Sequence, residues 1–157
     1  FIITIPHSVT TIGKDAFLNN KALESIVVVE KNKEFSTVDG VLYNKKGSSL
    51  IMYPAAKQGT FALPDAVEEI REGAFKNASL NDLTISKDSA LNTIRNNAFE
   101  GSAIANISLP EAVTVINSET LKNEKNLIGI TFFAYDKHGV SNDAIRYQSV
   151  GISSEST

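Results

Sequence analysis

Histidine and carboxylate side chains are the groups in this sequence whose chemistry could support catalysis or metal binding. His7 and His138 are the only imidazoles, 131 positions apart, and neither stands in a metal-binding or catalytic motif. His7 follows Pro6, and His138 lies in an Asp-Lys-His-Gly segment, so we interpret both as solvated turn residues. The two facing carboxylates that a glycosidase needs are not indicated by any spacing in the chain.

Known catalytic patterns are also missing from the sequence. It contains no G-x-S-x-G turn, no phosphate-binding glycine loop and no H-E-x-x-H helix motif. It has no Cys that could serve as a nucleophile, form a disulfide or hold zinc. We therefore predict that the protein is not an enzyme and uses no cofactor and no metal.

Composition narrows the classes of partner. The 157 residues are 42% hydrophobic, and Lys+Arg 15 against Asp+Glu 18 give a net charge of −3, which argues against nucleic-acid binding. No run approaches the roughly 18 apolar residues of a membrane helix, so we predict no membrane insertion within this chain. Residues 1–6 read as the end of a repeat strand, and we expect the natural protein to extend upstream.

An internal repeat must position any binding residues. Residues 67–75 read VEEIREGAF and align with LNTIRNNAF at 91–99, and looser copies occupy 9–17 and 113–121. The spacing from Ile70 to Ile94 is 24 residues, which falls in the range of leucine-rich repeats, about 20 to 29 residues. Each copy is followed by an L-x-x-L-x-L segment whose last three positions alternate, as a half-buried strand requires.

These patterns predict an α/β fold. We expect a right-handed leucine-rich-repeat solenoid with short parallel strands, short helical turns at the Ala-Phe positions and an inserted β-hairpin. Phe17, Phe75 and Phe99 should stack as one interior column. The solenoid is predicted over residues 1–132, with about four repeats and the hairpin insert at 29–62. Residues 133–157 should form a C-terminal cap and tail, with a short helix at 142–148.

The insert carries two tyrosines with two possible roles. We expect strands at 38–43 and 50–54, joined by a turn at 44–47. Tyr43 and Tyr53 could display a binding surface on this protrusion, or they could pack the hairpin onto the coil beneath it. We favour packing, because aromatic side chains commonly fill that place.

Alternate positions of the predicted strands define a candidate binding face. If the strand Leu and Ile side chains point inward, the exposed positions are Ser25, Val27, Asp82, Thr84, Asn106, Ser108, Gly129 and Thr131. They are small and mostly neutral, which suits close approach by a protein or a sugar. The same pattern also fits the solvated side of a short solenoid, and the face lacks the Arg and aromatic anchors of a strong hot spot.

The repeat resembles a known family. Residues 63–85, LPDAVEEIREGAFKNASLNDLTI, are similar to the BspA-type leucine-rich repeat, whose pattern runs L-P-x-x-V-x-x-I-G-x-x-A-F-x-x-C-x-x-L-x-x-I. The insert also resembles an interruption common in that family. The frequent Cys of the family is replaced here by Asn20, Ala78, Ser102 and Glu124.

The resemblance implies a place outside the cell and a role in binding proteins. Family members occur on surface proteins of gut and oral bacteria and of some parasitic protists, and some bind host matrix or serum proteins. We therefore predict a bacterial, non-catalytic, cell-surface or secreted module that mediates protein–protein binding in adhesion or host interaction. A structural spacer of a larger surface protein and a glycan-binding accessory domain remain alternatives, the second resting on Tyr43 and Tyr53 alone.

Overall fold

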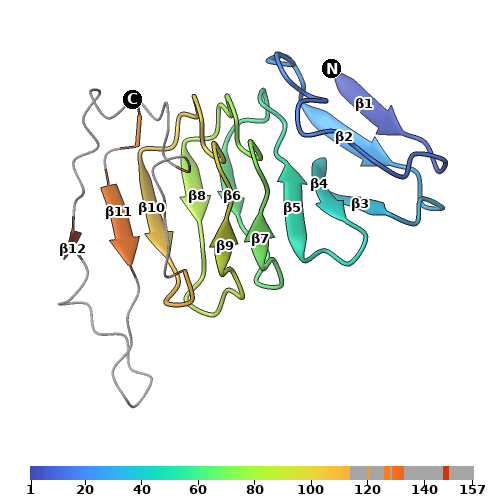
Figure 1. Ribbon diagram of the computed structural model, residues 1–157. Coiled ribbons are helices and arrows are strands. Elements are labelled where there is room, and N and C mark those ends of the chain that lie inside the picture. The colour runs from blue at the N-terminus through green and yellow to red at the C-terminus, as the bar shows by residue number, and fades with distance from the viewer. Residues whose placement is uncertain (114–119, 121–125, 128, 133–146, 149–157) are drawn as a thin grey trace.

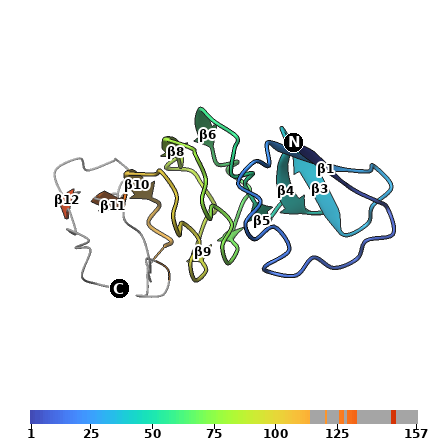
Figure 2. The same ribbon diagram turned by 90° about the horizontal axis from the view of Figure 1, so that it is seen from above.

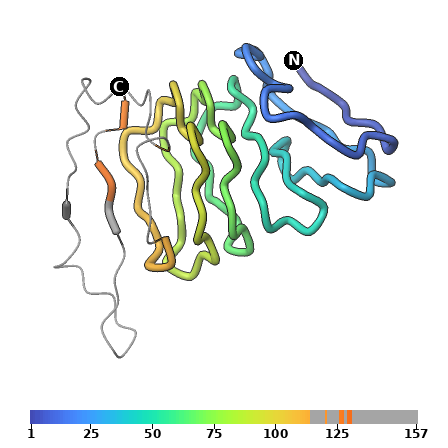
Figure 3. The backbone as a smooth tube through the Cα atoms, viewed as in Figure 1, coloured from blue at the N-terminus to red at the C-terminus, as the bar shows by residue number. Residues whose placement is uncertain are grey.

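Short strands make up the regular structure of this protein. The computed structural model describes residues 1–113, 120, 126–127, 129–132 and 147–148. The strands in this part of the chain are β1 (Ile2–Ile5), β2 (Ser25–Val28), β3 (Phe35–Val38), β4 (Val41–Asn44), β5 (Ser49–Met52), β6 (Thr60–Ala62), β7 (Glu69–Ile70), β8 (Asp82–Thr84), β9 (Thr93–Ile94), β10 (Asn106–Leu109), β11 (Gly129–Phe132) and β12 (Tyr147–Gln148). The chain winds so that strands from successive coils lie side by side (Figures 1 and 3).

Two sides of the coil carry parallel strands. On one side β6 pairs with β8, and β10 pairs with β11, while β8 and β10 lie next to each other. On the other side β5, β7 and β9 pair in register, with Leu50, Ile70 and Ile94 in one row. Seen from above, β6 and β8 lie on the side opposite β9 (Figure 2). The predicted parallel-strand solenoid is confirmed.

A three-stranded meander joins this second side. β3 pairs with β4, and β4 with β5, both antiparallel, so β5 links the meander to the parallel strands β7 and β9. The strand expected over 38–43 is interrupted, because Asp39 and Gly40 have φ of 50° and 80° and form the tight turn between β3 and β4. Two successive positive φ angles match the right-handed twist of a hairpin, and Asp-Gly favours them.

Residues 48–68 form a coil of their own. Leu50 stands beside Ile70 in the sheet, only 20 residues earlier, whereas Ile70 and Ile94 are 24 apart. The Tyr53 amide donates to the Ala74 carbonyl at 2.8 Å, as the Phe75 amide donates to Ala98 at 2.7 Å. Tyr53 therefore holds the place that Phe75 and Phe99 hold in their coils.

The interior column is aromatic, but its members differ from those predicted. The rings of Tyr53 and Phe75 stack with centroids 5.4 Å apart, and those of Phe75 and Phe99 with centroids 5.6 Å apart. Phe61 packs on the first two rings. Phe17 is not part of the column. It packs, half-buried, in a second hydrophobic cluster around Leu23, Ile26 and Leu42.

The predicted helical turns are wrong: the described residues contain no helix, so the fold is a β-solenoid rather than α/β. Gly73 and Asn77 both have positive φ, which leaves three residues between them, too few for an α-helical turn. The amides there make i→i+3 turn bonds or donate across to the next coil, as Asn77 does to the Glu100 carbonyl at 2.8 Å. The short segment gains more partners by pairing with its neighbour than a single helical turn could supply.

The two ends of the chain add shorter pairings. β1 and β2 form a separate parallel pair, inclined to the stacked coils in Figure 1. β12 pairs antiparallel with β11, so the helix predicted over 142–148 is wrong at Tyr147–Gln148, and its residues 142–146 lie outside the described residues. The division into a solenoid (1–132) and a cap and tail (133–157) stays a prediction, because nearly all of the second part lies outside them.

Candidate functional site

The candidate face lies on strands β8, β10 and β11. Leu83, Ile107 and Ile130 are buried, whereas Asp82, Thr84 and Asn106 are exposed. This alternation arises because successive side chains of a strand point to opposite faces. The inward residues fill the core, so the outward positions are available to a partner.

The register arranges the outward positions in two rows. Asn106 pairs with Gly129 and Ser108 with Thr131 across β10 and β11, and Asp82 and Thr84 hold the same positions of β8. Asn106 leans over Gly129, since a Cβ at residue 129 would lie 2.5 Å from its Oδ1. The face is therefore a shallow ladder of small side chains.

Sequence reasoning missed one strand of this face. On β6, Thr60 and Ala62 are exposed and pair with Asp82 and Thr84, so they extend both rows by one coil. The dipeptide Leu63-Pro64, which comes directly after β6, could have indicated this strand, because Leu109-Pro110 stands at the end of β10. The sequence prediction instead places residues 60–62 in the insert at 29–62.

Ser25 and Val27 do not join these rows. They lie on β2, which pairs with β1 in a separate sheet. Val27 is exposed, but Ser25 is half-buried against the β3–β4 turn, where Gly40 approaches so closely that a Cβ would lie 2.5 Å from the Ser25 Oγ. The predicted site residues thus fall on two surfaces.

The two tyrosines are packing residues. Tyr43 is 3% exposed and Tyr53 is fully buried, with its hydroxyl donating to the Lys57 carbonyl at 3.2 Å. Burial, followed by the nearby charge of Asp39, raises the pKa of Tyr43 to about 12. Neither side chain is available to a ligand.

Of the two histidines, the structure describes only His7. His7 is exposed in the turn after β1, and His138 lies outside the described residues. In the described part of the chain, no three side chains of the kinds that bind metals gather at one point. None of the described residues forms a helix that could span a membrane.

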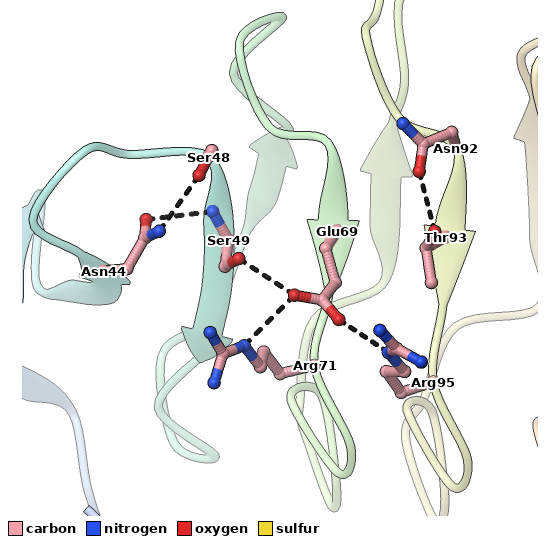
Figure 4. A network of polar contacts seen from close by, with 8 residues as sticks. All are labelled: Asn44, Ser48, Ser49, Glu69, Arg71, Asn92, Thr93 and Arg95. Atoms are coloured by element: carbon pink, nitrogen blue, oxygen red, sulfur yellow. Dashed lines mark hydrogen bonds and ion pairs between the residues drawn. The ribbon is translucent and has the colours of Figure 1, made fainter. Parts of the chain in front are cut away.

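A charged cluster on the other side of the coil was not predicted. Glu69 on β7 accepts hydrogen bonds from Arg71 Nε at 3.2 Å, from Arg95 Nε at 2.6 Å and from the Ser49 hydroxyl at 3.0 Å (Figure 4). The sequence does contain an indication of this cluster, because the dipeptide Ile-Arg occurs at both 70–71 and 94–95. Residues at the same position of successive repeats stack in space, which brings the two arginines close together.

Glu69 is ionised under ordinary conditions. Burial tends to raise its pKa, but the hydrogen bonds from Arg95 and Ser49 and the charges of Arg71 and Arg95 outweigh burial and hold the pKa below its ordinary value. Next to this cluster is an open groove of about 730 Å³. Its lining includes Ile12 and Phe17, from the segment between β1 and β2, and Ile51 and Met52 of β5.

The stacked coils with parallel strands on two sides define the class of the protein as a leucine-rich-repeat-like solenoid. Residues 2–46 and 51–148 match the BspA type leucine rich repeat region in six copies, and the chain belongs to this family. The four copies counted from the sequence are therefore too few. The coil that contains β5 and β6 is matched from residue 51 onward, and it escaped the count because Tyr53 replaces Phe and the coil is shorter.

Solved structures show the same fold. A leucine-rich repeat protein from Eubacterium ventriosum matches with 34% identity and a TM-score of 0.73, over 85% of this chain and 36% of that one. The pneumococcal vaccine antigen PcpA matches with 24% identity and a TM-score of 0.69, over 83% of this chain and 38% of that one. The chain spans little more than a third of either protein. No curated protein matches it.

Proposed function

We propose that this chain is a non-catalytic protein-binding module of a bacterial cell-surface or secreted protein, with a role in adhesion or host interaction. The observation that carries the proposal is the ladder of small side chains on β6, β8 and β10. Most of its positions are exposed, whereas Ser108 is half-buried, and the residues between them point into the core. Such a stacked, regular surface is the default binding site of repeat proteins. The partner would be a protein, for example a host matrix or serum protein.

Family membership supports the proposal. Leucine-rich repeats are interaction modules in general, and one protein of the same fold is a vaccine antigen, which agrees with display outside the cell. The family pattern itself consists of core and turn residues, so we expect the ligand to depend on the outward positions, which the pattern leaves unspecified.

A binding screen with face variants tests the proposal. The immobilised chain is exposed to matrix and serum proteins, and any partner is titrated against Asp82→Arg, Thr84→Arg and Asn106→Arg. Each substitution places a bulky cation on the ladder without touching the core. Affinity should fall at least about tenfold, because a single misfitting side chain at the centre of an interface commonly costs that much.

Asn92→Arg is the matched control, since residue 92 is exposed beside β9, on the other side of the coil. A partner that tolerates all three face variants as well as this control binds elsewhere, and the proposal for the face fails. A chain that captures no partner in the screen, while a neighbouring domain of the longer protein does, is a spacer. The glycan-binding alternative has lost its support, because both tyrosines are buried.

A further inference from the structure

The groove beside the charged cluster is lined by both apolar and charged side chains. Phe17, Ile51 and Met52 supply apolar lining; they are half-buried and keep part of their surface in the groove. Arg71 and Arg95 also line the groove and follow β7 and β9, which lie beside β5 on neighbouring coils. A ligand that fills the groove therefore meets both hydrophobic surface and guanidinium groups.

The two guanidinium groups are held in place and still have donors to offer. Each donates to Glu69 through Nε, and no hydrogen bond recorded among the described residues uses their terminal Nη groups. Arg71 is 50% and Arg95 60% exposed, whereas Glu69 is 19% exposed beneath them. Because parallel strands lie about 4.8 Å apart, one carboxylate can reach both arginines, as Glu69 itself does.

The local charge favours an anion. Three cations, Lys14, Arg71 and Arg95, and two carboxylates, Glu69 and Glu72, line the groove and leave one net positive charge on a chain whose net charge is −3. Both carboxylates are already paired, Glu69 with the two arginines and Glu72 with Lys14 at 3.6 Å. The volume of about 730 Å³ is that of an ordinary ligand site.

We propose that this groove binds an acidic peptide segment of a partner protein. An Asp or Glu carboxylate of the segment would bridge the Nη groups of Arg71 and Arg95, and the neighbouring apolar side chain would pack against Phe17 and Met52. The apolar lining favours a peptide over a sulfated glycan, which has no hydrophobic side chain to place there. The site lies apart from the β6–β8–β10 face and does not depend on it.

A synthetic peptide of alternating Asp and Leu, carrying a fluorescent label, is the probe. Its anisotropy is followed as the full chain is added at low salt. The same peptide with Asn in place of Asp, and a heparin oligosaccharide, are titrated in parallel. Binding of the Asp peptide alone, weakening as salt is added, supports the proposal, because partly exposed ion pairs are screened by salt. Heparin binding without peptide binding overturns it.

Charge variants locate the site. The double variant Arg71→Gln, Arg95→Gln should weaken peptide binding at least about tenfold, because it removes both charge-assisted donors. Lys87→Gln is the matched control: Lys87 is 59% exposed outside the groove, and its loss should change affinity less than about twofold. Equal affinities of wild type and double variant would overturn the assignment.

A measurement on the unaltered chain covers the case in which the double variant does not fold. In nitrogen-edited NMR spectra, the Nε–H signals of Arg71 and Arg95 should shift when the Asp peptide is added, and the backbone amides of Asp82 and Thr84 should not. The opposite pattern would reject the groove and place peptide binding on the β8 face. Failure of the groove and failure of the face are thus read out separately.

Discussion

At the scale of single residues, Glu69 shows how the repeat brings charge together. Its carboxylate is mostly buried and accepts hydrogen bonds from two coils besides its own, from Ser49 and from Arg95. The contribution of Glu69 to the stability of the fold depends on its ionisation. A buried carboxylate that is protonated loses the favourable interaction with the guanidinium groups, which offsets the cost of its desolvation.

The lowered pKa of Glu69 predicts a loss of stability in acid. A carboxyl group whose pKa is lower in the folded state than its ordinary pKa of 4.5 stabilises the fold when the pH is above 4.5. This stabilisation is lost as the pH falls through the pKa that the group has in the folded state. Urea unfolding of wild type and Glu69→Gln should show a clear difference near neutral pH. The difference should shrink steadily below pH 4.5. A difference that is independent of pH would contradict the assignment.

Phe75 should be the most sensitive aromatic position. It is fully buried with a ring on either side, so Phe75→Ala should lower the free energy of unfolding by about 3 to 5 kcal/mol. Phe17→Ala is the matched comparison, since the same truncation removes a half-buried ring of the other cluster. Its effect in urea unfolding should be smaller. Equal losses would mean that column and cluster contribute alike.

At the scale of elements, turns decide where strands begin and end. Gly40 and Gly47 have nearly the same φ, 80° and 78°, but differ in surroundings: a Cβ at Gly40 would lie 2.5 Å from the Ser25 Oγ, whereas Gly47 has nothing within 4 Å. Gly40 is therefore required both for its positive φ and for the close approach of Ser25, whereas Gly47 is required for its positive φ alone.

Alanine at the two glycines should separate these reasons. Gly47→Ala should cost about 1 to 2 kcal/mol, the strain of a left-handed conformation in a residue with a Cβ. Gly40→Ala should cost more, because β2 must also move away from the turn. Thermal unfolding of both variants, with Ser25→Ala added to Gly40→Ala, provides the measurement. The added change should recover part of the excess, and identical losses at Gly40 and Gly47 would contradict the close approach.

Strands could be predicted where one face is buried, because alternation leaves a period of two in the sequence, as in Asn106 to Leu109. The Ala-Phe turns could not be assigned correctly, because the pattern does not reveal that their amides donate to the next coil. Tyr53 was missed as a column member, since only the hydrogen bond from its amide to Ala74 shows which coil position it holds.

The candidate site could also be predicted only in part, where the repeat pattern alone decides the position of a residue. Asp82, Thr84 and Asn106 could be placed on one exposed face, because register follows from the repeat. Ser25 and Val27 could not be excluded from it, since the incline of β2 depends on packing against the β3–β4 turn. The pairing of Glu69 with Arg95 is 26 residues distant in sequence and depends on an exact coil length.

At the scale of the molecule, the described coils stack mainly on their neighbours, and Lys14 also reaches past the coil of residues 48–68 to pair with Glu72. The described core falls into two clusters, one around the Tyr53–Phe75–Phe99 column and one around Leu23, Ile26 and Leu42. Stability in such a molecule is a sum of coil terms and interface terms, and a change in one coil is felt by the next.

Double-mutant cycles on the column test this nearest-neighbour rule. Phe75 stacks on both Tyr53 and Phe99, whereas Tyr53 and Phe99 are two coils apart, with Phe75 between them. With each ring replaced by Leu, the cycles Tyr53/Phe75 and Phe75/Phe99 should give coupling energies of about 0.5 to 1.5 kcal/mol. The Tyr53/Phe99 cycle should be additive within about 0.5 kcal/mol, because its members share no direct contact. A coupling for the outer pair as large as for the inner pairs would mean that the column responds as one block, and the description of the protein as stacked coils stabilised by adjacent interfaces would have to be replaced by that of a single cooperative core.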